Sequence, residues 1–163
     1  MLIGCAIYVN DYYPADDLVQ EALVSNETVT VMQEKNTIAF VPEAPTAGFI
    51  FLFLGGSMAA SYVANAAEEY EGLVLLASYS TADLCDTDLR VISIYGSENG
   101  VLNREKYAEY AQNLPADLEE TVITGGCHAN FGSYGIQKSD GTPSISQKTQ
   151  IEITAQLLGD FLL

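Results

Sequence analysis

The chain has 163 residues, of which 48% are apolar, and its 22 acidic and 6 basic side chains give a net charge of −16. This length and apolar content suffice for one globular core, which excludes a fibrous or disordered chain. The negative charge would repel a phosphate backbone, so nucleic acid is not an expected partner. We therefore predict a single domain over 1–163.

The chain begins with an apolar run over 1–9, whereas a membrane-spanning helix needs about 20 residues. Residues 1–12 are either a first strand or the remnant of a longer anchor or signal segment. The second interpretation would place a longer form outside the cytoplasm or at a membrane, and the first leaves the chain in the cytoplasm. The cysteines Cys5, Cys85 and Cys127 have neither metal-ligand spacing nor an even number for disulfides, so no metal and no cofactor is expected.

Hydrophobic spacing and turn residues predict the secondary structure. In chain order we expect a helix over 15–25, a hairpin of strands 28–33 and 37–41, a strand over 48–54, a helix over 58–70, strands over 72–77 and 89–95, a helix over 104–113, a strand over 119–124 and a helix over 146–163. The hairpin should lie at a sheet edge. The alternation of apolar strands with amphipathic helices predicts an α/β fold, a three-layer α/β/α sandwich with a mostly parallel sheet.

In a parallel sheet, ligands bind beyond the carboxyl ends of the strands, so the loops that follow strands are where functional side chains are expected. Three such loops carry polar residues: Gly55-Gly56-Ser57, Gly96-Ser97-Glu98-Asn99-Gly100 and Gly125-Gly126-Cys127-His128. Their order in the chain matches serine, then aspartate or glutamate, then histidine, which is the order of the catalytic triad in the α/β-hydrolase fold.

Four segments carry a more specific resemblance, namely GGSMAASY (55–62), GLVLLASYST (72–81), IYGSENGVLN (94–103) and GGCHANFGSYG (125–135). Together and in this order they resemble α/β-hydrolase family 5, and the start of the chain resembles the N-terminal strands of that family. The resemblance implies hydrolysis of a small ester-like substrate by Ser-His-Asp chemistry of the esterase or acyl-hydrolase type. It gives His128, the one histidine in the chain, the role of general base and acid.

The chain departs from the family at the nucleophile. Family members resemble Gly-His-Ser-Leu-Gly-Gly there, and alignment on Gly55-Gly56 places Phe53 at the position of the serine. About two βα units that precede the nucleophile strand in the family are missing, which indicates an internal deletion around the nucleophile elbow. Ser57 offers two alternatives: it is a replacement nucleophile on a glycine-rich turn, or the N-cap of the following helix.

The acid position departs as well, because Asn99 stands where family members have aspartate. An amide cannot carry the charge, and its NH₂ group favours the wrong imidazole tautomer. Deamidation of Asn99 before the unhindered Gly100 would regenerate an aspartate, and we keep this as a hypothesis.

Two functions follow. The first is a hydrolase of impaired activity in which His128 and Ser57 act and Asn99 occupies the acid site. The alternative is a non-catalytic binding or structural module derived from a hydrolase. In either case the missing strands would expose a sheet edge, so a homodimer through that edge is expected.

Overall fold

The computed structural model of the chain describes residues 24–34, 37–43, 49–52, 56–132 and 135–162. These residues belong to two units of dense internal contact: 1–44 with 132–135, and 45–131 with 136–163. The segment 1–12 and all but the end of the predicted helix over 15–25 lie outside the described residues. Whether the chain forms one domain stays a prediction.

The first unit contains a hairpin of β1 (Val29–Glu34) and β2 (Thr37–Pro42). The two strands pair antiparallel, with Val29 opposite Pro42 and Glu34 opposite Thr37. The predicted hairpin is therefore confirmed. The expectation that it joins the edge of a larger sheet is wrong, because β1 and β2 form a two-stranded sheet of their own. The two strands follow each other in the sequence with a short connection, so they can pair locally and do not need a strand of the larger sheet.

The second unit is built on a four-stranded sheet with the order β3-β4-β5-β6. Its strands are β3 (Phe49–Leu52), β4 (Gly72–Leu76), β5 (Arg90–Gly96) and β6 (Glu119–Ile123). All neighbouring pairs are parallel, which confirms the prediction from the apolar runs and intervening helices. In this sheet β3 and β6 are the outer strands, and dimerisation through an edge stays a prediction.

Three helices accompany the sheet: α3 (Gly56–Ala64), α4 (Arg104–Tyr110) and α5 (Gln147–Leu162). The helix predicted over 58–70 ends earlier, at Ala64, because the next backbone N–H groups bond three residues back, as Ala66 N does to Val63 O at 3.0 Å. A separate 3₁₀ turn, Ala67–Glu69, follows. Likewise α4 passes into a 3₁₀ turn over Ala111–Asn113 before Pro115.

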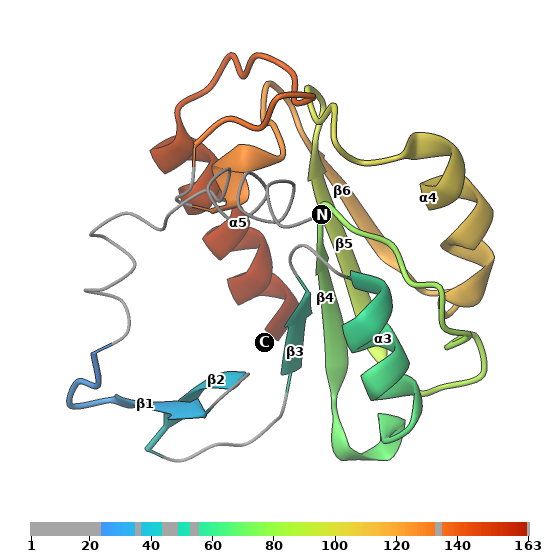
Figure 1. The fold of residues 1–163 in the computed structure, drawn as a ribbon. Coiled ribbons are helices and arrows are strands. Elements are labelled where there is room, and N and C mark those ends of the chain that lie inside the picture. Colours follow the sequence, from blue (N-terminus) through green and yellow to red (C-terminus); the bar gives the residue numbers. More distant parts are fainter. Residues whose placement is uncertain (1–23, 35–36, 44–48, 53–55, 133–134, 163) are drawn as a thin grey trace, which may run out of the picture. The chain divides into compact units, whose positions relative to one another are not determined.

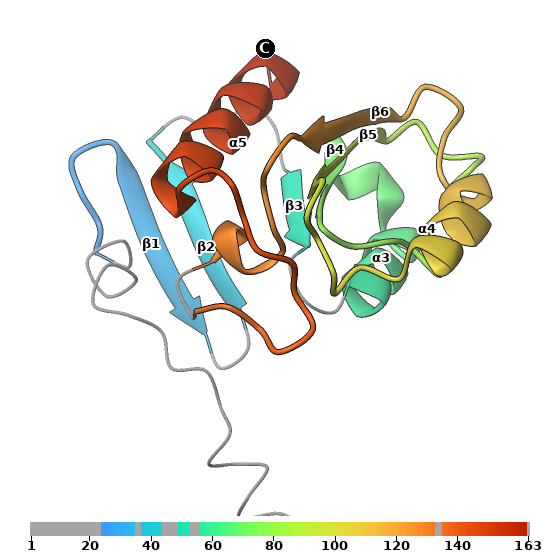
Figure 2. The same ribbon diagram turned by 90° about the horizontal axis from the view of Figure 1, so that it is seen from above.

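The sheet lies between two layers of helix (Figures 1 and 2). On one face, Val63 of α3 packs with Leu73 and Leu75 of β4, and on the other, Phe161 of α5 packs with Val74. Alternate residues of β4 thus enter opposite cores, as expected for a strand buried on both faces. In Figure 2, α3 and α4 cover one side of the sheet and α5 the other, which confirms the three-layer α/β/α sandwich. Within the described ranges, no helix has the length and apolar character needed to cross a membrane.

Candidate active site

The loops after β5 and β6 lie side by side at the carboxyl ends of these strands. Glu98 N donates to Gly126 O at 2.8 Å, and Gly125 N donates to Ser97 Oγ at 2.8 Å. The approach requires glycine, because a Cβ atom on Gly96 would lie 2.1 Å from Gly126 O. The sequence pattern therefore placed the two loops correctly at one edge of the sheet.

The loop after β4 reaches the same place. Ala77 has a φ of 51°, a left-handed conformation that is uncommon for a residue with a side chain. Ala77, Tyr95 and Leu102 form one buried cluster, against which Tyr79 packs. Residues at the carboxyl ends of β4 and β5 and in the loops that follow thus pack together.

Asn99 and His128 meet within this edge. Asn99 Nδ2 lies 3.5 Å from His128 Nδ1, and the two residues are 6% and 2% exposed. Asn99 Oδ1 accepts hydrogen bonds from Leu102 N at 2.8 Å and Val101 N at 3.0 Å. Because a backbone N–H can only donate, these two bonds fix which end of the amide is oxygen. The NH₂ group is therefore the end that faces the imidazole.

This orientation bears on where the imidazole carries its proton. An NH₂ group can only donate, so its contact with Nδ1 favours the neutral tautomer that has the lone pair on Nδ1 and the proton on Nε2. The contact between Asn99 and His128 is long for a hydrogen bond, but a proton on Nδ1 would point at another donor. A general base for a serine hydroxyl needs the opposite tautomer, with the proton on Nδ1 and a free Nε2.

Burial lowers the pKa of His128 below its ordinary value of 6.5, and the negative charge of Asp140 opposes the shift without cancelling it. This shift favours the neutral form of the ring at pH 7. Its tautomer, rather than its charge, is what the contact with Asn99 controls.

Asp140 is a site residue that the sequence analysis missed. Its Oδ1 accepts hydrogen bonds from the backbone N–H groups of Gly100 and His128, both at 3.1 Å, and its Oδ2 accepts one from Ala129 N at 2.8 Å. Burial acts to raise the pKa of Asp140, but these hydrogen bonds outweigh it and hold the pKa below 3.8. The Asp-Gly pair at 140–141 predicts a turn, and nothing in the sequence indicates which backbone groups the carboxylate would bind.

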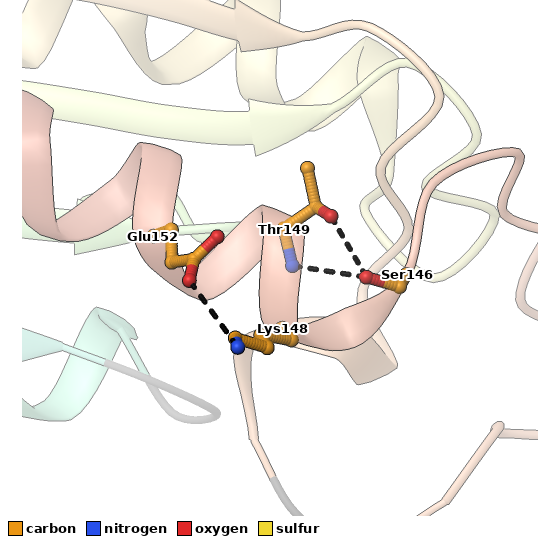
Figure 3. A network of polar contacts seen from close by, with 4 residues as sticks. All are labelled: Ser146, Lys148, Thr149 and Glu152. Atoms are coloured by element: carbon orange, nitrogen blue, oxygen red, sulfur yellow. Dashed lines mark hydrogen bonds and ion pairs between the residues drawn. The ribbon is translucent and has the colours of Figure 1, made fainter.

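Gln150 is a second residue that the sequence analysis missed. Its side chain is fully buried, and it accepts a hydrogen bond from Cys127 N at 3.0 Å while donating one to Cys127 O at 2.9 Å. Gln150 lies in the first turns of α5, whose start is fixed by Ser146 Oγ, which accepts from Thr149 N at 3.1 Å (Figure 3). On the exposed side of the same turn, Lys148 and Glu152 form an ion pair of 3.8 Å (Figure 3).

Ser57 is the second residue of α3 and follows the carboxyl end of β3. Ser57 therefore lies at the start of this helix, and both alternatives for it, replacement nucleophile and N-cap, stay predictions. Phe53 lies outside the described residues. The role of Ser57 in the site stays a prediction.

Among the residues that the structure describes, no group of three or more His, Cys, Asp or Glu side chains could hold a metal ion. Cys127 is buried and Cys85 is exposed, and both are free thiols. The expectation that the chain uses no cofactor stays a prediction.

The chain is a parallel α/β sandwich. The loops after two neighbouring strands bring together a buried histidine, His128, and an amide, Asn99, at the position of the acid. This arrangement is typical of an α/β protein of the hydrolase type. A model of the alpha/beta hydrolase family matches residues 22–152, and the chain belongs to this family. This confirms the resemblance found in the sequence motifs.

Two further comparisons add little to the family assignment. The crystal structure of a predicted CIB-like hydrolase from Thermoplasma acidophilum is similar over 69% of this chain and 50% of that chain, with 14% identity and a TM-score of 0.48. This chain therefore spans about half the length of that protein. A comparison with curated protein sequences found no match.

Proposed function

We propose that the chain is a hydrolase of ester-like bonds, of the esterase or acyl-hydrolase type, whose activity is impaired in its present sequence. The observation that carries this proposal is the contact of Asn99 Nδ2 with His128 Nδ1 at 3.5 Å. This contact brings His128 together with the residue at the acid position. That residue is an amide, however, and it selects the tautomer with the proton on Nε2, which cannot act as a general base for serine.

The proposed reaction is acyl transfer to Ser57 followed by hydrolysis. The hydroxyl oxygen of Ser57 would form a bond to the carbonyl carbon of the ester while its proton moves to His128 Nε2. The same proton would then pass to the departing alcohol. In the second half of the reaction, water would attack the acyl group, His128 Nε2 would take the proton of the water and return it to the Ser57 oxygen, and the carboxylic acid would leave. With Nε2 already protonated, the first transfer has no acceptor, which is why we expect very slow turnover.

The loop around Asn99 is suited to an aspartate. A carboxylate in the same place would keep the bonds from Val101 N and Leu102 N on one oxygen and present its second oxygen to His128 Nδ1. That oxygen would accept a hydrogen bond from Nδ1–H and so select the tautomer with a free Nε2. Asn99→Asp is therefore expected to repair the acid position without rebuilding the loop.

Hydrolysis of p-nitrophenyl acetate tests the proposal with the wild-type chain, Asn99→Asp, and Asn99→Asp combined with either His128→Ala or Ser57→Ala. We expect a gain in kcat of at least tenfold for Asn99→Asp, with an upper bound of about 10⁴, the cost of the reverse change in a serine protease. The gain should vanish in both double variants. A gain that survives Ser57→Ala would remove Ser57 from the mechanism, and the absence of any gain in a folded Asn99→Asp chain would reject the hydrolase proposal.

The alternative function is a non-catalytic module, and the 2% exposure of His128 favours it, because a catalytic imidazole must reach its substrate. A fluorophosphonate probe separates the two functions. An activated serine forms a covalent adduct with the probe, so labelling of Asn99→Asp that is lost in the Ser57→Ala double variant supports the hydrolase. Equal lack of labelling in all these chains would support the module.

A further inference from the structure

The carboxylate of Asp140 binds both loops of the candidate site at once. Its Oδ1 accepts from Gly100 N, directly after Asn99, and from His128 N, each at 3.1 Å. Its Oδ2 accepts from Ala129 N at 2.8 Å. One side chain, from a later stretch of the connection between β6 and α5, thus links the backbone of the acid position to the backbone of the histidine.

The position of this carboxylate is fixed by its own loop. Gly141 N donates to Glu98 O at 3.0 Å, and a Cβ atom on Gly141 would lie 2.1 Å from the same oxygen. On the other side of the contact, a Cβ atom on Gly100 would lie 2.2 Å from Ser139 O. Two glycines therefore let the loop over 139–141 lie directly against the loop that carries Asn99, so Asp140 is held in place by backbone contacts.

We propose that Asp140 is a positioning residue of this site, which holds Asn99 and His128 in register and supplies the negative charge beside the imidazole that Asn99 lacks. The inference rests on the proposed function for its catalytic meaning. Among the described contacts, the neutral amide of Asn99 meets the ring and the carboxylate of Asp140 accepts from the histidine backbone N–H, while the thiol of Cys127 hydrogen-bonds to the same carboxylate. The negative charge of Asp140, which accepts a hydrogen bond from the His128 backbone N–H, raises the pKa of the imidazole, because screening in the protein interior is weaker than in water.

The test is a proton NMR titration of the full chain, because His128 is the one histidine and gives an isolated signal. We would compare the wild type with Asp140→Asn and with Asp140→Ser, whose hydroxyl can still accept one backbone N–H bond. The matched control is Asp117→Asn, which removes the same charge at an exposed residue before β6, whereas His128 follows β6. Circular dichroism would establish which variants are folded.

The expected result is a fall of about one pH unit in the midpoint of the His128 titration in the Asp140 variants, with no change in the control. A folded Asp140 variant with an unchanged midpoint would overturn the proposal, since a purely structural carboxylate could weaken the fold without moving this midpoint. Loss of folding in both variants would also overturn it, by making Asp140 a general structural residue. The titration measures the pKa of the His128 imidazole and does not measure turnover, so this result is independent of whether the chain proves to be a hydrolase.

Discussion

The side-chain amide of Gln150 makes two hydrogen bonds to the backbone of Cys127, accepting from its N at 3.0 Å and donating to its O at 2.9 Å. In this way a residue of α5 satisfies both backbone polar groups of Cys127 in the loop after β6. Because Cys127 immediately precedes His128, these two hydrogen bonds fix the backbone that carries the imidazole.

Replacement of Gln150 by leucine should destabilise the chain by about 2–4 kcal/mol, because it leaves a buried N–H and a buried C=O of Cys127 without partners. Urea unfolding followed by circular dichroism measures the change. Gln156→Leu is the matched control, since Gln156 lies on the exposed side of the same helix and should change stability by less than about 0.5 kcal/mol. Equal effects of the two substitutions would show that the two hydrogen bonds between Gln150 and Cys127 do not contribute to stability.

Gly96→Ala should prevent the loops after β5 and β6 from meeting. The new methyl group would lie 2.1 Å from Gly126 O, a backbone atom that cannot turn away. Gly159→Ala is the contrasting control, because no atom lies within 4 Å of its added Cβ and a helical glycine gains about 0.5–1 kcal/mol on this change. Thermal unfolding should therefore give a lower Tm for the first variant and a higher Tm for the second. A Gly96→Ala chain as stable as the wild type would contradict the close approach.

The central strands β4 and β5 of the second unit could be predicted from the sequence because both are continuous apolar segments that are buried. The loops were harder. Glycine pairs and the order of Ser57, Asn99 and His128 indicated where the site lies. Asp140 and Gln150 contribute through several side-chain hydrogen bonds to backbone groups, and such bonds leave no periodic signal in the sequence. The hairpin was found but its place was not, because local pairing carries no information about which sheet a strand joins.

The tautomer of His128 can be read directly. Nitrogen-15 NMR of the wild-type chain at pH 8 should show the proton on Nε2, because Asn99 presents its NH₂ group to Nδ1. In Asn99→Asp the proton should move to Nδ1. Asn113→Asp, a change of the same kind in the 3₁₀ turn after α4, should leave the tautomer as in the wild type. A wild-type ring protonated on Nδ1 would mean that the amide does not control the imidazole.

The buried imidazole should make stability depend on pH. The pKa of His128 is lower in the folded chain than its ordinary value of 6.5, so below that value the unfolded chain binds the proton more readily. The free energy of unfolding should therefore fall as the pH is lowered through 6.5 and stop falling from this cause below the folded pKa. His128→Gln removes the titrating group, so the difference between the two urea denaturation series from pH 7.5 to 5 isolates the effect. Parallel series would show that burial does not shift the histidine.

Deamidation at Asn99 should be slower in the folded chain than in the unfolded one. Cyclisation needs Gly100 N to attack the amide carbon of Asn99, yet Gly100 N donates to Asp140 Oδ1 at 3.1 Å and Asn99 Oδ1 is held by Leu102 N at 2.8 Å. Both bonds must break before the atoms can approach, and Asn99 is only 6% exposed to water. Peptide mapping by mass spectrometry, after parallel incubation of native and urea-unfolded chains, would follow the gain of one dalton at this site. If the native chain converts as fast as the unfolded one, the loop does not protect Asn99, and an aspartate would arise at the acid position with age.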